Sequence, residues 1–154
     1  MSTRSPLPPN EMIHCIGDSH VCIYSGANKI QPLWPDPATP HIPNLKVYRV
    51  GAVSAYNLIE PNRGLRGREK LNHITNELPS GSNVLLCFGA IDCLVHLKKF
   101  ADKQNRPVEE LIQETVERYL TAIAEVQAKG HRVFVHNVIP SVKKRPTKAF
   151  PYYG

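Results

Sequence analysis

The chain has 154 residues and a mass of 17.3 kDa, a length that suits one domain burying about 68–70% of its unfolded surface. Apolar residues make up 42% of it and charged residues 21%, which excludes disordered and collagen-like chains. No run approaches the roughly 18 apolar residues of a membrane span, and the amino-terminal MSTRSPLPPNE lacks the apolar region of a secretory signal. We therefore predict a cytoplasmic protein.

The net charge of +6 is concentrated at the carboxyl-terminal end. From Val126 onward there is no Asp or Glu, and there are six basic residues: Lys129, Arg132, Lys143, Lys144, Arg145 and Lys148. The KKRPTK run could contact nucleic acid or lipid headgroups. A solvated surface loop explains it as well, and we do not expect nucleic acid as a partner.

The first third of the chain contains one predicted strand and one long loop. Residues 1–11 are a Pro-rich tail, and the domain proper is expected over 12–154. MIHCIG (12–17) is typical of a buried strand, and a short helix is predicted over 19–24. Five prolines around Trp34 predict a loop over 29–44, and a loop of that length is often a functional surface.

The rest of the chain alternates predicted strands and helices. Apolar runs predict further strands over 45–50, 83–89 and 132–138. Composition or apolar spacing predicts helices over 52–60, 68–78 and 108–130. Strands that are apolar throughout and separated by helices indicate an α/β fold with a parallel sheet covered on both faces. In such folds ligands bind at the carboxyl ends of the strands.

Glycines end the first three predicted strands, at Gly17, Gly51 and Gly89, and short polar motifs follow two of them. The motifs are Gly17-Asp18-Ser19 and Gly89-Ala90-Ile91-Asp92. From about Ile13 to Pro140 the chain resembles the SGNH hydrolases, also called the GDSL esterase/lipase family. The resemblance implies a three-layer αβα sandwich with a parallel, flavodoxin-like sheet, of which four strands are visible here and the fifth is missing.

The resemblance also implies a serine ester hydrolase that works through an acyl-serine intermediate. Ser19 would be the nucleophile, and its own amide and that of Gly51 would stabilise the oxyanion. Gly89 and Asp92 would shape the same site. The implied substrate is a small-molecule ester, with no cofactor and no metal. A second interpretation is that Asp18-Ser19 only caps the following helix.

The sequence departs from the family pattern in two places. Ile91 stands where the family has an oxyanion asparagine, and its side chain donates no hydrogen bond. The Asp-x-x-His motif that supplies the acid and base is absent, since no acidic residue follows Glu125. The only acid-x-x-His is Glu11-Met12-Ile13-His14, which lies at the wrong edge of the sheet.

Three other histidines are candidates for the missing base. His20 adjoins the serine, although neighbouring side chains on a turn usually point apart. Asp18, beside both, is a further residue that could support the site. His96 follows Asp92 by four residues, so a helix there would place both on one face. We favour a site-shaping hydrogen bond for this pair, and a hydrogen-bonded core position for His136.

The missing motif leaves the function open between two classes. We interpret the chain as a fragment, a truncated product or a degenerate member of the family, and so as inactive or nearly inactive by itself. The alternative is a non-catalytic α/β domain that binds through the strand-end cleft or the basic tail. The identity of the base and the oligomeric state stay undecided at this stage.

The four cysteines, Cys15, Cys22, Cys87 and Cys93, lack CxxC spacing. Nothing indicates an oxidising compartment, so we predict reduced, slowly reacting and mostly buried thiols. Cys15 and Cys87 should lie inside adjacent strands.

Overall fold

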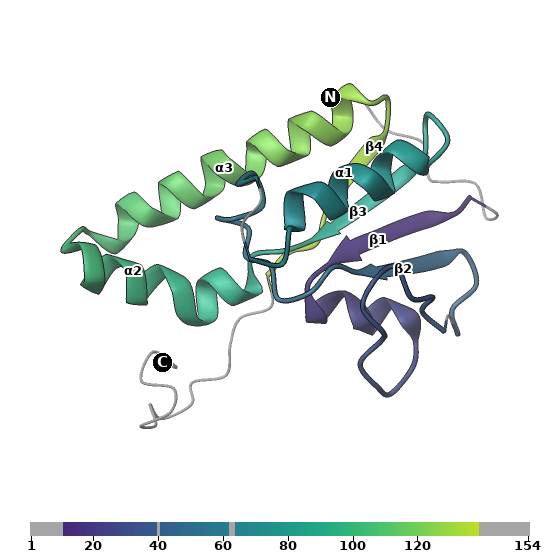
Figure 1. Ribbon diagram of the computed structural model, residues 1–154, viewed down its shortest axis with the longest axis horizontal. Coiled ribbons are helices and arrows are strands. Elements are labelled where there is room, and N and C mark those ends of the chain that lie inside the picture. The colour runs from purple at the N-terminus through teal and green to yellow at the C-terminus, as the bar shows by residue number, and fades with distance from the viewer. Residues whose placement is uncertain (1–10, 40, 62–63, 139–154) are drawn as a thin grey trace.

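The computed structural model describes residues 11–39, 41–61 and 64–138. Its centre is a sheet of four parallel strands in the order β2-β1-β3-β4 (Figure 1). The strands are β1 (Ile13–Gly17), β2 (Leu45–Arg49), β3 (Asn83–Cys87) and β4 (Arg132–Val135). The predicted α/β fold with a parallel sheet is therefore confirmed.

Helices cover both faces of this sheet, which makes three layers. α1 (Gly67–Glu77) and α3 (Val108–Ala128) lie on one face, and the 3-10 helix η1 (Ser19–Ser25) lies on the other (Figure 1). Alternate strand residues form the two cores, because successive side chains of a strand point to opposite faces. Ile16 and Leu86 belong to the core under α1 and α3, whereas Cys15 and Val47 belong to the core under η1.

The predicted helix boundaries are close to those observed where the signals are local. α3 begins after Pro107 and ends two residues before Gly130, whose φ of +88° suits the left-handed conformation that ends helices. η1 ends at Gly26 in the same way, with φ of +70°. Each strand is one to three residues shorter than its apolar run.

Two predictions for the connections are wrong or incomplete. Residues 52–60 form successive turns instead of a helix, with backbone bonds such as Asn57 N to Ser54 O (3.2 Å) and Leu58 N to Ala55 O (3.2 Å). Conversely, η2 (Asp92–His96), a π-helical segment, leads into α2 (Leu97–Gln104), a helix that we did not predict independently. The carboxylate of Asp92 binds two backbone amides of segment 52–60, as described below.

All four cysteines are free thiols. Cys15, Cys22 and Cys87 are buried, with Cys15 and Cys87 in the neighbouring strands β1 and β3, as predicted. Burial raises the pKa of Cys15 to about 12. Cys93 is exposed, so the expectation of four slowly reacting thiols is corrected to three.

The terminal predictions fall mostly outside the described residues. Residues 1–10 of the tail and the basic run at 143–148 lie there. Of the basic residues that are described, Lys129 Nζ donates to Thr75 Oγ1 (2.7 Å) and Arg132 pairs with Glu11. None of the helices in the described part of the chain is both long and apolar enough to span a membrane.

Candidate active site

The turns that follow β1, β2 and β3 meet at one edge of the sheet, because the carboxyl ends of parallel strands share an edge. Hydrogen bonds join them directly. Val50 N donates to Gly17 O (2.9 Å), and Asp18 N donates to Cys87 O (3.2 Å). Ser19 begins η1 immediately after this junction and is half-buried. The edge therefore brings together Ser19, Gly51 and the segment 89–92.

The close approach of β1 and β3 at this edge requires glycine at position 17. A Cβ there would lie 2.3 Å from the carbonyl oxygen of Cys87, a backbone atom that cannot move aside. Gly51 and Gly89 have φ of +113° and +104°, a region that side chains disfavour. The backbone geometry thus explains why glycine stands at the end of each of these three strands.

Asp18 is fully buried at the start of η1 and serves two groups of His20. Its Oδ1 accepts a hydrogen bond from the backbone amide of His20 (2.8 Å) and lies 2.9 Å from Nδ1 of the imidazole. The first contact is the helix cap that the sequence suggested. The second fixes the orientation of the ring while 41% of the His20 side chain stays exposed. The carboxylate of Asp18 therefore both caps η1 and pairs with the imidazole of His20.

Asp92 is also buried, and its carboxylate binds backbone instead of His96. Oδ2 accepts from the amide of Ala55 (2.6 Å) and Oδ1 from the amide of Tyr56 (3.1 Å). Burial raises the pKa of Asp92, while these amides and the nearby His96 oppose the rise. Among the described residues, the expected hydrogen bond between Asp92 and His96 is therefore absent, and the carboxylate instead joins the turn after β2 to the turn after β3.

The remaining histidines do not reach Ser19. Within the described residues no hydrogen bond joins the Ser19 hydroxyl to an imidazole. His96 lies against Phe100 (5.3 Å between ring centroids), and burial lowers the pKa of its imidazole. His136 Nδ1 lies 2.7 Å from the hydroxyl of Tyr24, so the predicted hydrogen bond is present, but the residue is half-buried just after β4 and not in the core. His14 contacts Tyr48 at the amino end of β1, the opposite edge.

An apolar cavity of about 340 Å³ adjoins this edge between α2, α3 and β4. Its lining includes Gly89, Asp92, Cys93 and His136 together with apolar side chains such as Leu97, Ile112 and Val116. Such a cavity could receive an apolar part of a substrate.

Sequence reasoning missed the amides of Ala55 and Tyr56 as partners of Asp92. No motif marks them, since backbone amides carry no sequence signature. Sequence reasoning also left open that Asp18 would hold the ring of His20. The one available signal was the spacing Asp18-x-His20, which alone does not fix a rotamer.

The comparisons with known proteins add no family. No protein-family model matches this chain, and no curated protein matches its sequence. Across residues 11–39, 41–61 and 64–138, no three or more His, Cys, Asp or Glu side chains cluster closely enough to hold a metal ion.

Proposed function

We propose that this chain is an SGNH-like serine ester hydrolase domain that is acylated at Ser19 and turns over slowly. The observation that carries the proposal is the Asp18–Ser19–His20 turn. It is held by a buried carboxylate, and its neighbours at the same sheet edge are two glycines with positive φ.

In the proposed reaction the Ser19 hydroxyl oxygen attacks the carbonyl carbon of the ester and loses its proton to a base. The carbonyl oxygen becomes an oxyanion facing the amides of Ser19 and Gly51. The alcohol then leaves as the carbonyl re-forms, taking up a proton. Water attacks the acyl-serine in the same manner and releases the acid and free Ser19.

His20 is the base of this proposal, because Asp18 fixes its Nδ1 and leaves Nε2 as the atom that can accept a proton. The missing contact between His20 and the Ser19 hydroxyl accounts for slow turnover. Ile91 removes a further donor from the oxyanion site. A well-built hydrolase without a working triad retains roughly 10³–10⁴-fold acceleration over water, and this site has fewer donors.

Covalent labelling tests the nucleophile without requiring turnover. A fluorophosphonate should modify Ser19, identified by peptide mass spectrometry, and Ser19→Ala should remove the label. Ser80, exposed in the loop before β3, is the matched control: Ser80→Ala should label like the parent chain. Absence of label on Ser19, or equal label on Ser80, would refute the proposed nucleophile.

Turnover of 4-nitrophenyl acetate should stay near the buffer rate, and Ser19→Ala should change it little. Robust turnover that Ser19→Ala abolishes would show that a competent base is present and that slow turnover is wrong. His20→Ala and His96→Ala would then identify that base.

The second candidate function is a non-catalytic binding domain that uses the same edge. The missing hydrogen bond between Ser19 and an imidazole favours it. A chain that fails to label at Ser19 yet unfolds cooperatively would support this alternative.

A further inference from the structure

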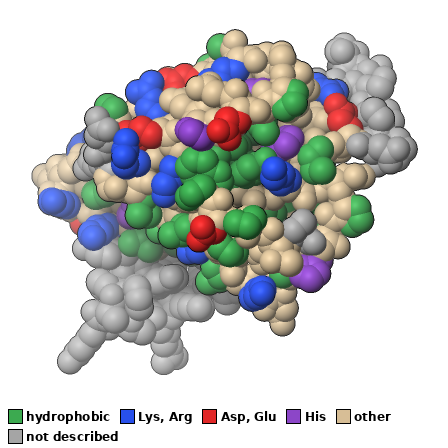
Figure 2. Space-filling model, turned by 45° about the vertical axis from the view of Figure 1, so that its right-hand side comes forward, with side chains coloured by type: hydrophobic (Ala, Val, Ile, Leu, Met, Phe, Trp, Pro, Cys, Tyr) green, Lys and Arg blue, Asp and Glu red, His purple; other side chains and the backbone are tan. Residues whose placement is uncertain are grey.

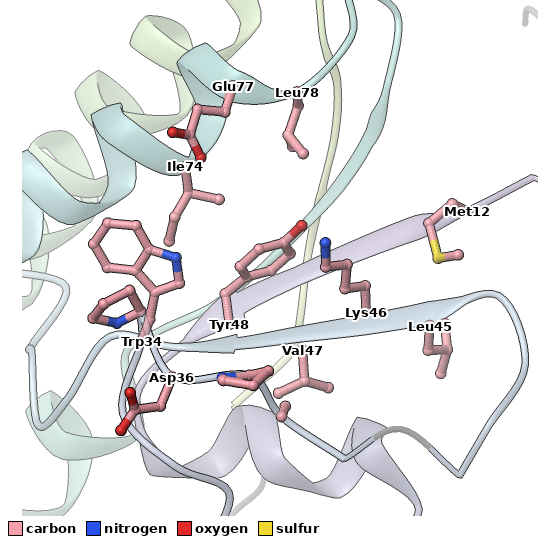
Figure 3. A pocket seen from close by; sticks show the side chains of 13 residues that line it. Met12, Trp34, Asp36, Leu45, Lys46, Val47, Tyr48, Ile74, Glu77 and Leu78 are labelled. Atoms are coloured by element: carbon pink, nitrogen blue, oxygen red, sulfur yellow. The ribbon is translucent and has the colours of Figure 1, made fainter.

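A groove of about 440 Å³ runs beside β2. One wall is β2 itself, from Leu45 to Tyr48, and the other is the Pro-rich segment from Trp34 to Ala38. The end of α1 closes the top with Ile74, Glu77 and Leu78 (Figure 3). Hydrophobic side chains gather on this face, with acidic, basic and histidine side chains around them (Figure 2).

β2 is an outer strand of the sheet, so one side of its backbone has no neighbouring strand. Asn44 O and Val50 N bond to β1. Because backbone groups of a strand alternate in direction, the amide and carbonyl of Val47 point away from β1, toward the groove side. Arg49 confirms this alternation, since its carbonyl accepts from Trp34 N (2.8 Å) on the outer side.

The Pro-rich segment does not continue this pairing beyond Trp34. Pro35 and Pro37 have no amide hydrogen to donate. Within the described residues, no hydrogen bond reaches the amide or carbonyl of Val47 from this side. Val47 is 5% exposed as a whole residue, and an added strand would give its amide and carbonyl hydrogen-bond partners.

The side chains around the groove could contact both the apolar residues and the charged end residues of an extended peptide. Trp34 and Tyr48 rise on the α1 side, where Figure 3 shows them facing a common space. The carboxylate of Glu77 lies on that side near Trp34, 2.9 Å from Nε2 of His73 (Figure 3). The ammonium of Lys46 lies 5.3 Å from the centre of the Tyr48 ring. A basic residue would therefore fit over Trp34 and an acidic residue beside Lys46.

We propose that the groove binds an extended peptide, which adds to the sheet as a strand beside β2. The peptide would carry apolar residues between one basic and one acidic residue. Strand addition of this kind combines main-chain hydrogen bonds for affinity with side-chain pockets for specificity.

Trp34 is the only tryptophan of the chain, so its fluorescence reports on this groove directly. The probes are the capped peptides Arg-Val-Thr-Val-Asp and Asp-Val-Thr-Val-Arg, which differ only in direction. We expect a saturable fluorescence change with tighter binding of one of them, whose order fixes the strand direction. Hydrogen exchange at the Val47 amide should slow when that peptide binds.

Two N-methylated versions of the tighter peptide provide the main control, one blocked at residues 2 and 4 and the other at residue 3. Only the version whose blocked amides face β2 should bind more weakly, with an affinity about tenfold lower for each hydrogen bond lost. Lys46→Glu should weaken binding about two- to fivefold, while Lys103→Glu, an exposed lysine on α2, should not.

The proposal is wrong if neither peptide causes a saturable change, or if both N-methylated versions bind as well as the parent. Preferential binding of the capped peptide Pro-Leu-Pro-Pro would also overturn it, since a polyproline helix cannot pair with β2.

Discussion

Replacing Asp92 tests whether one buried carboxylate holds the strand-end edge together. In Asp92→Ala the amides of Ala55 and Tyr56 lose their acceptor (2.6 and 3.1 Å). An unpaired buried donor costs about 1–3 kcal/mol. Ala55 is 1% exposed whereas Tyr56 is only half-buried, so water can reach the second amide more easily. We expect a loss of about 2–3 kcal/mol in the free energy of unfolding, partly offset by removing a buried charge.

Asp92→Asn keeps one acceptor and turns an NH₂ group toward the other amide, so it should cost about 1–2 kcal/mol. Because burial raises the pKa of Asp92 above its ordinary 3.8, its protonation stabilises the fold. That contribution is fully present below about pH 3.8 and is lost as the pH rises through the folded-state pKa. The stability gap between the parent chain and Asp92→Asn should therefore narrow as pH rises from 4 toward 7.

Urea unfolding at several pH values measures both effects. Asp102→Asn is the matched control, since Asp102 makes only an exposed pair with Lys98 (3.2 Å) and should change stability by less than about 0.5 kcal/mol. A loss below about 0.5 kcal/mol for Asp92→Ala would refute the anchoring role. A gap that stays constant with pH would refute the raised pKa.

Three further experiments test the glycine at the end of β1, the thiols and the carboxylate of Asp18. Gly17→Ala should cost more than about 3 kcal/mol or prevent folding, since its Cβ would meet the carbonyl oxygen of Cys87 at 2.3 Å. Gly64→Ala, with open space and φ of +50°, should cost only about 1 kcal/mol in the same urea assay, and equal losses would contradict the steric argument. Thiol titration should find one fast thiol, Cys93, three slow ones, and four in denaturant; two or fewer in denaturant would mean disulfides. Asp18→Ala should lose about 1–2 kcal/mol with the helix cap. Asp18→Asn should keep most of that stability yet slow the labelling of Ser19, and labelling at the parent rate would refute its orienting role.

Much of the fold follows from local sequence signals. The apolar runs at 13–17 and 83–87 form buried strands because they pack on both faces, and their helical separation requires parallel pairing. Gly26 and Gly130 end helices because they adopt positive φ without penalty. The meeting of Ser19, Gly51 and segment 89–92 at one edge follows from that topology alone.

Tertiary contacts decided what local signals could not. Residues 52–60 have helical composition, yet the Asp92 carboxylate, 36 or 37 positions away, binds two of their amides and favours turns. Asp18 and His20 pair because burial leaves that carboxylate few other partners, a choice of rotamer that spacing does not encode. For the Pro-rich segment the sequence predicted only a surface loop. Its position against the outer edge of β2, which creates the groove, depends on which strand lies outermost, and only the folded sheet determines that.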